Sequence, residues 1–128
     1  MNSRSDDKMA LEHHNLGNDY YKIGDFDKAI EHYSESIKIK PDFLESFFNR
    51  GLAYSRLRRF EEAVRDHSRV IELNPQQSEA YYTRGLMYEY LGEYDKALRD
   101  YEKALSLQPE NQEIINQKEI VLRKKNMK

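Results

Sequence analysis

Cysteine is absent from this chain of 128 residues, and glycine and proline are scarce, with five and three copies. Without cysteine the chain can have no disulfide framework and no thiolate chemistry. No apolar run approaches the length that spans a membrane, and the polar stretch 1–9 lacks the apolar core of a secretory signal. We therefore expect a soluble cytoplasmic protein with no membrane insertion.

The chain also lacks a strong charge of either sign. Its formal net charge is −2 and its isoelectric point is near 6.1, so no overall positive field favours nucleic acid, and we expect none as a partner. The mean hydropathy of −0.98 and the charged fraction of 34% are too polar for a compact globule. They fit an elongated stack, which exposes more surface per residue. The length allows one domain.

What the chain does contain is a pattern with a period of 34 residues, the spacing between Pro41, Pro75 and Pro109. A fixed period of this length is typical of stacked-repeat architectures. Residues of three further types keep the same spacing: Gly17, Gly51 and Gly85, Tyr20, Tyr54 and Tyr88, and Ala29, Ala63 and Ala97.

Between these positions, apolar residues recur at helical spacing rather than in strand-like alternation. Gly24 has the place of a helix C-terminal cap, and each proline prevents the preceding helix from continuing. The pattern predicts helices over 10–22, 26–39, 44–57, 60–73, 78–91, 94–107 and about 112–127.

The order of an aromatic, Leu-Gly, Tyr, Ala, a second aromatic and Pro resembles the tetratricopeptide repeat. The resemblance covers residues 10–111 and implies an all-α fold, a right-handed superhelical stack of antiparallel helix pairs with seven helices. It implies a single domain over 1–128. Its parts are a first repeat at 10–43, a second at 44–77, a third at 78–111, and a capping helix with a basic tail at 112–128.

Several residues have expected structural roles. Each mid-helix glycine is expected to let the second helix approach closely at the matching alanine, as Gly17 at Ala29. The capping helix is expected to cover the third repeat with an apolar stripe, and its basic tail is expected to complement the helix dipole. The stripe comprises Ile114, Ile115, Val121 and Leu122.

The second and third repeats have arginine where the pattern has leucine, and both also have aspartate at one second-helix position. The first repeat has neither residue, so the arginine and the aspartate occur together or not at all. We therefore predict ion pairs between Arg50 and Asp66 and between Arg84 and Asp100. A half-buried pair of this kind contributes little net stability. Loss of Asp66 is therefore expected to change stability little, whereas truncation of Leu16 in the first repeat should lower it sharply.

In the family that this pattern resembles, first helices line a concave groove that binds a peptide. Apolar and aromatic side chains outside the core are natural anchors for such a segment, although some could instead fold onto neighbouring helices and shield the core. By register, the candidate groove residues are His14, Asn18, Tyr21, Phe48, Asn49, Leu52, Tyr82, Thr83 and Leu86.

Many chaperone-binding members of the family grip a partner's C-terminus with a carboxylate clamp of two lysines, two asparagines and an arginine. Asn18 and Asn49 match the two asparagines by register. His14, Glu79 and Thr83 stand where the cations would be. A glutamate facing a carboxylate would repel it, which argues against binding of chaperone tails.

We expect no enzyme, no cofactor and no metal site. His13 and His14 are adjacent, so they point to different helix faces and cannot bind one metal ion together. No glycine-rich phosphate loop and no nucleophile can be distinguished from the ordinary polar residues of solvated helix faces. The expected function is that of an adaptor that binds a protein or peptide segment in its groove. Alternatives are a co-chaperone with a degenerate clamp and a self-assembling structural module; the expected state is a monomer or weak self-association.

Overall fold

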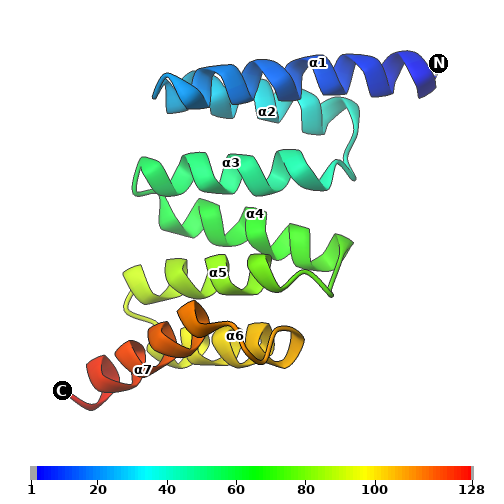
Figure 1. The fold of residues 1–128 in the computed structure, drawn as a ribbon. Coiled ribbons are helices and arrows are strands. Elements are labelled where there is room, and N and C mark those ends of the chain that lie inside the picture. The colour runs from blue at the N-terminus through cyan, green and yellow to red at the C-terminus, as the bar shows by residue number, and fades with distance from the viewer. Residues whose placement is uncertain (1–2, 128) are drawn as a thin grey trace.

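The computed structural model describes residues 3–127, and within that range every regular element is an α-helix (Figure 1). The all-α fold class predicted from the repeat is therefore confirmed. The helices are α1 (Ser3–Lys22), α2 (Phe26–Ile39), α3 (Leu44–Arg56), α4 (Phe60–Leu73), α5 (Ser78–Tyr90), α6 (Tyr94–Leu107) and α7 (Gln112–Asn126).

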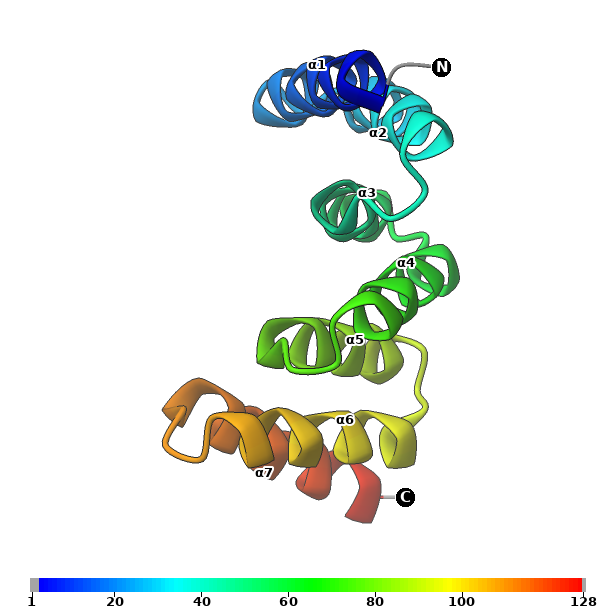
Figure 2. The same ribbon diagram turned by 90° about the vertical axis from the view of Figure 1, so that its right-hand side faces the viewer.

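Each helix packs mainly on its neighbours in the chain, as expected for a stack of repeated units. The pairs α1–α2, α3–α4 and α5–α6 follow one another, and the described chain begins and ends at opposite ends of the stack (Figure 1). Figure 2 shows that successive pairs are turned relative to one another, so the stack winds as it extends.

The helix ends follow local backbone chemistry. Lys40, Asn74 and Gln108 precede the three prolines and have ψ angles of 88°, 92° and 75°, outside the helical region, as the proline ring requires. Gly24 and Gly92 end the turns after α1 and α5 with φ angles of 83° and 76°. Arg58 occupies the matching position of the second repeat with φ 59°, and its guanidinium lies 5.2 Å from the centre of the Phe60 ring.

The first helix is longer than predicted. It begins at Ser3 rather than at residue 10, because nothing in the polar stretch before Ala10 interrupts a helix. Ala10 is fully buried, and its carbonyl accepts a hydrogen bond from Ser36 Oγ at 2.8 Å. Further out, Asp7 forms an ion pair with Lys40 at 3.6 Å. The extension therefore packs along the end of α2.

The nearest neighbour of each mid-helix glycine is a ring four residues after the matching alanine. A Cβ atom on Gly17 would lie 2.5 Å from a ring carbon of Tyr33, and one on Gly51 would lie 2.8 Å from His67 Nε2. For Gly17, the nearest atoms belong to the ring four residues after Ala29 on α2. A Cβ atom on Gly85 would likewise lie 2.6 Å from a ring carbon of Tyr101, and it would lie 3.3 Å from the Ala97 carbonyl oxygen.

We expect Gly17→Ala to lower the free energy of unfolding by about 1–3 kcal/mol, although alanine is the better helix former. The added methyl group must displace the Tyr33 ring, which is buried and hydrogen-bonded to Asn18. Urea denaturation measures the effect. Asn15→Ala, at an exposed position two residues away, serves as the control and should change stability by less than about 0.5 kcal/mol. Equal stability of the two variants would contradict this packing.

Both predicted ion pairs are confirmed. Arg50 donates from Nε and Nη2 to the two oxygens of Asp66 at 2.8 and 2.6 Å, and Arg84 does the same to Asp100 at 2.8 and 2.7 Å. The Leu16 side chain is 42% exposed, so its truncation removes less packing than a fully buried leucine would.

The capping helix α7 packs on α6 through Ile114 and Val121, which are buried as predicted. Leu122 is 39% exposed and does not contribute to the stripe. The basic tail does more than complement the dipole: Lys124 and Lys125 form ion pairs with Glu89 and Asp95, each at 2.6 Å. These pairs tie α7 to the third repeat.

Candidate peptide-binding groove

One part of the predicted groove is a hollow of about 170 Å³ between α1 and α3. Four of the predicted residues meet there: Asn18 and Tyr21 from α1, and Asn49 and Leu52 from α3. The structure adds Lys22 and, from α2, Tyr33. Lys22 lies four residues after Asn18 and thus on the same helix face, a signal that the sequence contained.

Two hydrogen bonds join the polar side chains of this hollow. Asn18 Oδ1 accepts one from the Tyr33 hydroxyl at 2.5 Å and one from Asn49 Nδ2 at 3.0 Å. Burial, aided by the nearby Tyr21, raises the pKa of Tyr33 to about 12, so the hydroxyl remains a donor at neutral pH. Both amide orientations are thereby set before any ligand arrives.

Two predicted groove residues, His14 and Thr83, are buried instead of lining an open surface. His14 Nδ1 lies 2.8 Å from Ser46 Oγ, the His14 ring stacks on Phe43, and burial lowers the His14 pKa. Thr83 donates its hydroxyl hydrogen bond to the Glu79 carbonyl at 2.8 Å, one helical turn back. Both side chains are hydrogen-bonded inside the stack, so their assignment to the open groove surface is corrected.

The aromatic residues Phe48 and Tyr82 are half-buried. Phe48 meets the His67 ring edge-on with the centroids 5.0 Å apart, and Tyr82 lies 5.7 Å from the Tyr101 ring. Burial, together with Glu113, raises the pKa of Tyr82 to about 12. Each ring therefore also shields the core, which was the alternative left open by the sequence.

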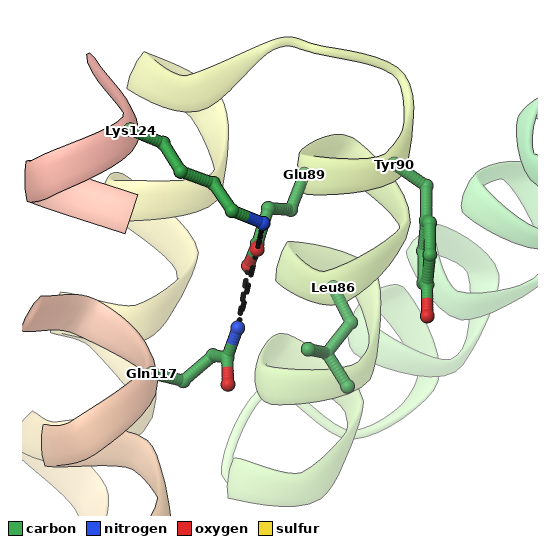
Figure 3. A pocket seen from close by; sticks show the side chains of 5 residues that line it. All are labelled: Leu86, Glu89, Tyr90, Gln117 and Lys124. Carbon is green, nitrogen blue, oxygen red and sulfur yellow. Dashed lines mark hydrogen bonds and ion pairs between the residues drawn. The ribbon is translucent and has the colours of Figure 1, made fainter. Parts of the chain in front are cut away.

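Leu86 borders a second hollow of about 210 Å³ between α5 and α7, where Glu89 is held by α7 (Figure 3). Gln117 Nε2 and Lys124 Nζ donate to the Glu89 carboxylate at 2.9 and 2.6 Å, and the Tyr101 hydroxyl donates at 2.8 Å. Burial alone would raise the pKa of Glu89, but these hydrogen bonds together lower it. The capping helix thus occupies the polar groups at this end of the groove.

Among the residues that the structure describes, no helix is long and apolar enough to cross a membrane. In the same part of the chain, no group of three or more histidine, aspartate or glutamate side chains is placed to hold a metal ion.

The stacked helix pairs and the preformed hollow define a helical-repeat protein-interaction module. Residues 44–77 and 78–111 match the family model described as "Tetratricopeptide repeat", and residues 17–57 match a second model described as "TPR repeat". The chain belongs to the tetratricopeptide repeat family.

Two solved structures are similar over most of the chain. The first TPR of Spaghetti (RPAP3), bound to the HSP90 peptide SRMEEVD, is 32% identical with a TM-score of 0.87, covering 91% of this chain and 93% of that one. The second TPR domain of human RPAP3, in complex with the HSP70 peptide SGPTIEEVD, is 29% identical with a TM-score of 0.84, covering 89% and 95%.

A curated relative is similar over a shorter stretch. Stress-induced-phosphoprotein 1 of Caenorhabditis elegans is 40% identical over 43 residues, which make up 34% of this chain and 13% of the relative. The matching segment is therefore a small part of that protein.

Proposed function

We propose that this chain is an adaptor that binds an extended segment of a partner protein in the hollow between α1 and α3. The observation that carries the proposal is the Asn18–Asn49 pair beside an apolar wall. The bonds within the hollow engage Asn18 Oδ1 and Asn49 Nδ2. The other atom of each amide, a donor on Asn18 and an acceptor on Asn49, is left for the ligand backbone.

The rest of the hollow determines which segment fits. Tyr21 and Leu52 form an apolar wall suited to one anchoring side chain of the ligand, and Lys22 adds a cation at the same site. A peptide with an apolar residue close to an acidic one matches this combination. Because the two amide side chains are already held, binding costs little additional ordering of the protein.

The test is a pull-down that compares the wild type with Asn49→Ala/Leu52→Ala. We expect preys of the wild type to bind the double variant at least tenfold more weakly, since both a backbone contact and an anchor wall are lost. Leu122→Ala is the matched control, because it shortens an exposed leucine that lies outside the hollow. Preys retained equally by all three proteins would exclude the hollow as the binding surface.

A co-chaperone with a degenerate clamp is the second candidate, favoured by the two asparagines and by the peptides bound in the similar structures. The clamp's cationic positions hold Glu79 and the buried His14 and Thr83, which leaves Lys22 as the cation that lines the hollow. Titration with SRMEEVD as free acid and as amide separates the two candidates. The adaptor is expected to show equal affinity for both forms, whereas a working clamp would lose affinity on amidation.

A further inference from the structure

The first repeat departs from the other two at one cluster of positions on α1 and α2. Where the second repeat has Phe47, Arg50 and Asp66, the first has His13, Leu16 and His32. The first repeat thus has no Arg–Asp pair; His32 stands at the aspartate position, and His13 stands at the aromatic position one turn before the arginine position. His13 and its chain neighbour His14 point to different helix faces, but the structure pairs His13 with His32 on the other helix.

The two imidazoles face each other across the α1–α2 interface. His13 Nδ1 lies 3.2 Å from His32 Nδ1, and the two rings are stacked with centroids 5.5 Å apart and an interplanar angle of 24°. On its other side, His32 stacks on Tyr20 with centroids 5.3 Å apart and planes within 6° of parallel. Ring contacts therefore hold both nitrogens in place, while both histidines remain partly open to solvent.

This separation matches what a divalent transition metal requires. Neutral imidazole is a common ligand of Zn²⁺, with zinc–nitrogen bonds of about 2.0–2.1 Å in a tetrahedral arrangement, which places two ligand nitrogens about 3.3 Å apart. The observed separation of 3.2 Å is close to this value, so the rings have to tilt toward the metal but not to move apart. The ring that donates from Nδ1 would carry its proton on Nε2 instead, so that both Nδ1 atoms present a lone pair, and water would complete the coordination.

We propose that His13 and His32 form a binding site for a divalent transition metal such as Zn²⁺, with the two Nδ1 atoms as protein ligands. Bound metal links α1 to α2 at the place where the later repeats have their Arg–Asp pair. A hard cation such as Mg²⁺ is not expected to bind, because it prefers oxygen ligands.

The experiment is a titration of the protein, without a polyhistidine tag, with zinc chloride. Calorimetry gives the affinity and stoichiometry, and NMR of the histidine side chains locates the site. We expect one ion per chain, with shifts in the His13 and His32 ring signals, while the buried His14 and His67 signals stay in place. Magnesium chloride is expected to produce neither effect.

Two variants test the assignment. His13→Phe introduces the residue that the second repeat has at this position, and His32→Asn removes the other imidazole with a smaller polar side chain. Each is expected to weaken Zn²⁺ binding at least tenfold while circular dichroism shows an unchanged helical content. Unchanged affinity in both folded variants, or zinc-induced shifts confined to other residues, would overturn the proposal. So would a wild type that binds no Zn²⁺.

Discussion

We expect Asp66→Ala to lower the free energy of unfolding by about 3 kcal/mol. Asp66 is 3% exposed and accepts two hydrogen bonds from Arg50. Burial raises the pKa of Asp66, and Arg50 opposes that rise. Because the cost of burying the charges offsets their attraction, the intact pair contributes little net stability. Removing the carboxylate alone leaves the largely buried guanidinium without its counter-charge, with only Ser34 and neighbouring rings as partners. This reverses the small effect expected from the sequence.

Denaturation in urea of three proteins tests this result: the wild type, Asp66→Ala, and the double variant Arg50→Leu/Asp66→Leu. The double variant should recover most of the lost stability, since replacing a buried pair by apolar residues is often neutral. The first repeat already has Leu16 at the arginine position. If the single and double variants were equally destabilised, the loss would come from packing rather than from an unpaired charge.

The second large effect is a loss of stability in acid caused by His67. This side chain is fully buried between helices, and both ring nitrogens lack a hydrogen-bond partner in the described part of the chain. Burial, with a smaller contribution from Arg84, lowers the pKa of His67 to about 4 from the usual 6.5. Between these values the unfolded chain binds a proton that the folded chain does not, so stability falls as pH falls. The loss amounts to about 2 kcal/mol between pH 7.5 and pH 5.

The control for this prediction is His67→Phe, measured over the same pH range. The equivalent positions hold Tyr33 and Tyr101 over glycines, so a six-membered ring suits the site. We expect the variant to be at least as stable as the wild type at pH 7.5, because two unsatisfied nitrogens are removed. The difference between the two proteins should then grow as pH falls. Parallel pH profiles would show that other groups, such as His14, account for the acid sensitivity.

Most of the fold was predictable from periodicity alone. Helices α2, α4 and α6 have the predicted bounds, and α3, α5 and α7 end one residue earlier than predicted. Glycine and proline act through their own backbone angles, which need no distant partner. The start of α1 was missed because polar residues without a breaker give no local signal of where a helix begins.

The candidate site was less predictable. The repeat register correctly predicted that Asn18 and Asn49 lie close to Tyr21 and Leu52. It could not show that His14 would be satisfied by Ser46 inside the stack, because that contact joins residues 32 positions apart. Nor could it show that the Glu89 carboxylate would be engaged by three side chains from α6 and α7.

The absence of cysteine and of long apolar runs, together with the 34-residue period, determined the class of fold and where its helices end, since both depend on local backbone preference and on which face of a helix is apolar. Only the tertiary structure decided which polar side chains are engaged by other residues and which remain accessible. Burial and hydrogen bonding between distant helices engage Glu89, Lys124 and His14. The same helix packing joins Asn18 to Asn49 by a hydrogen bond and brings His13 to His32.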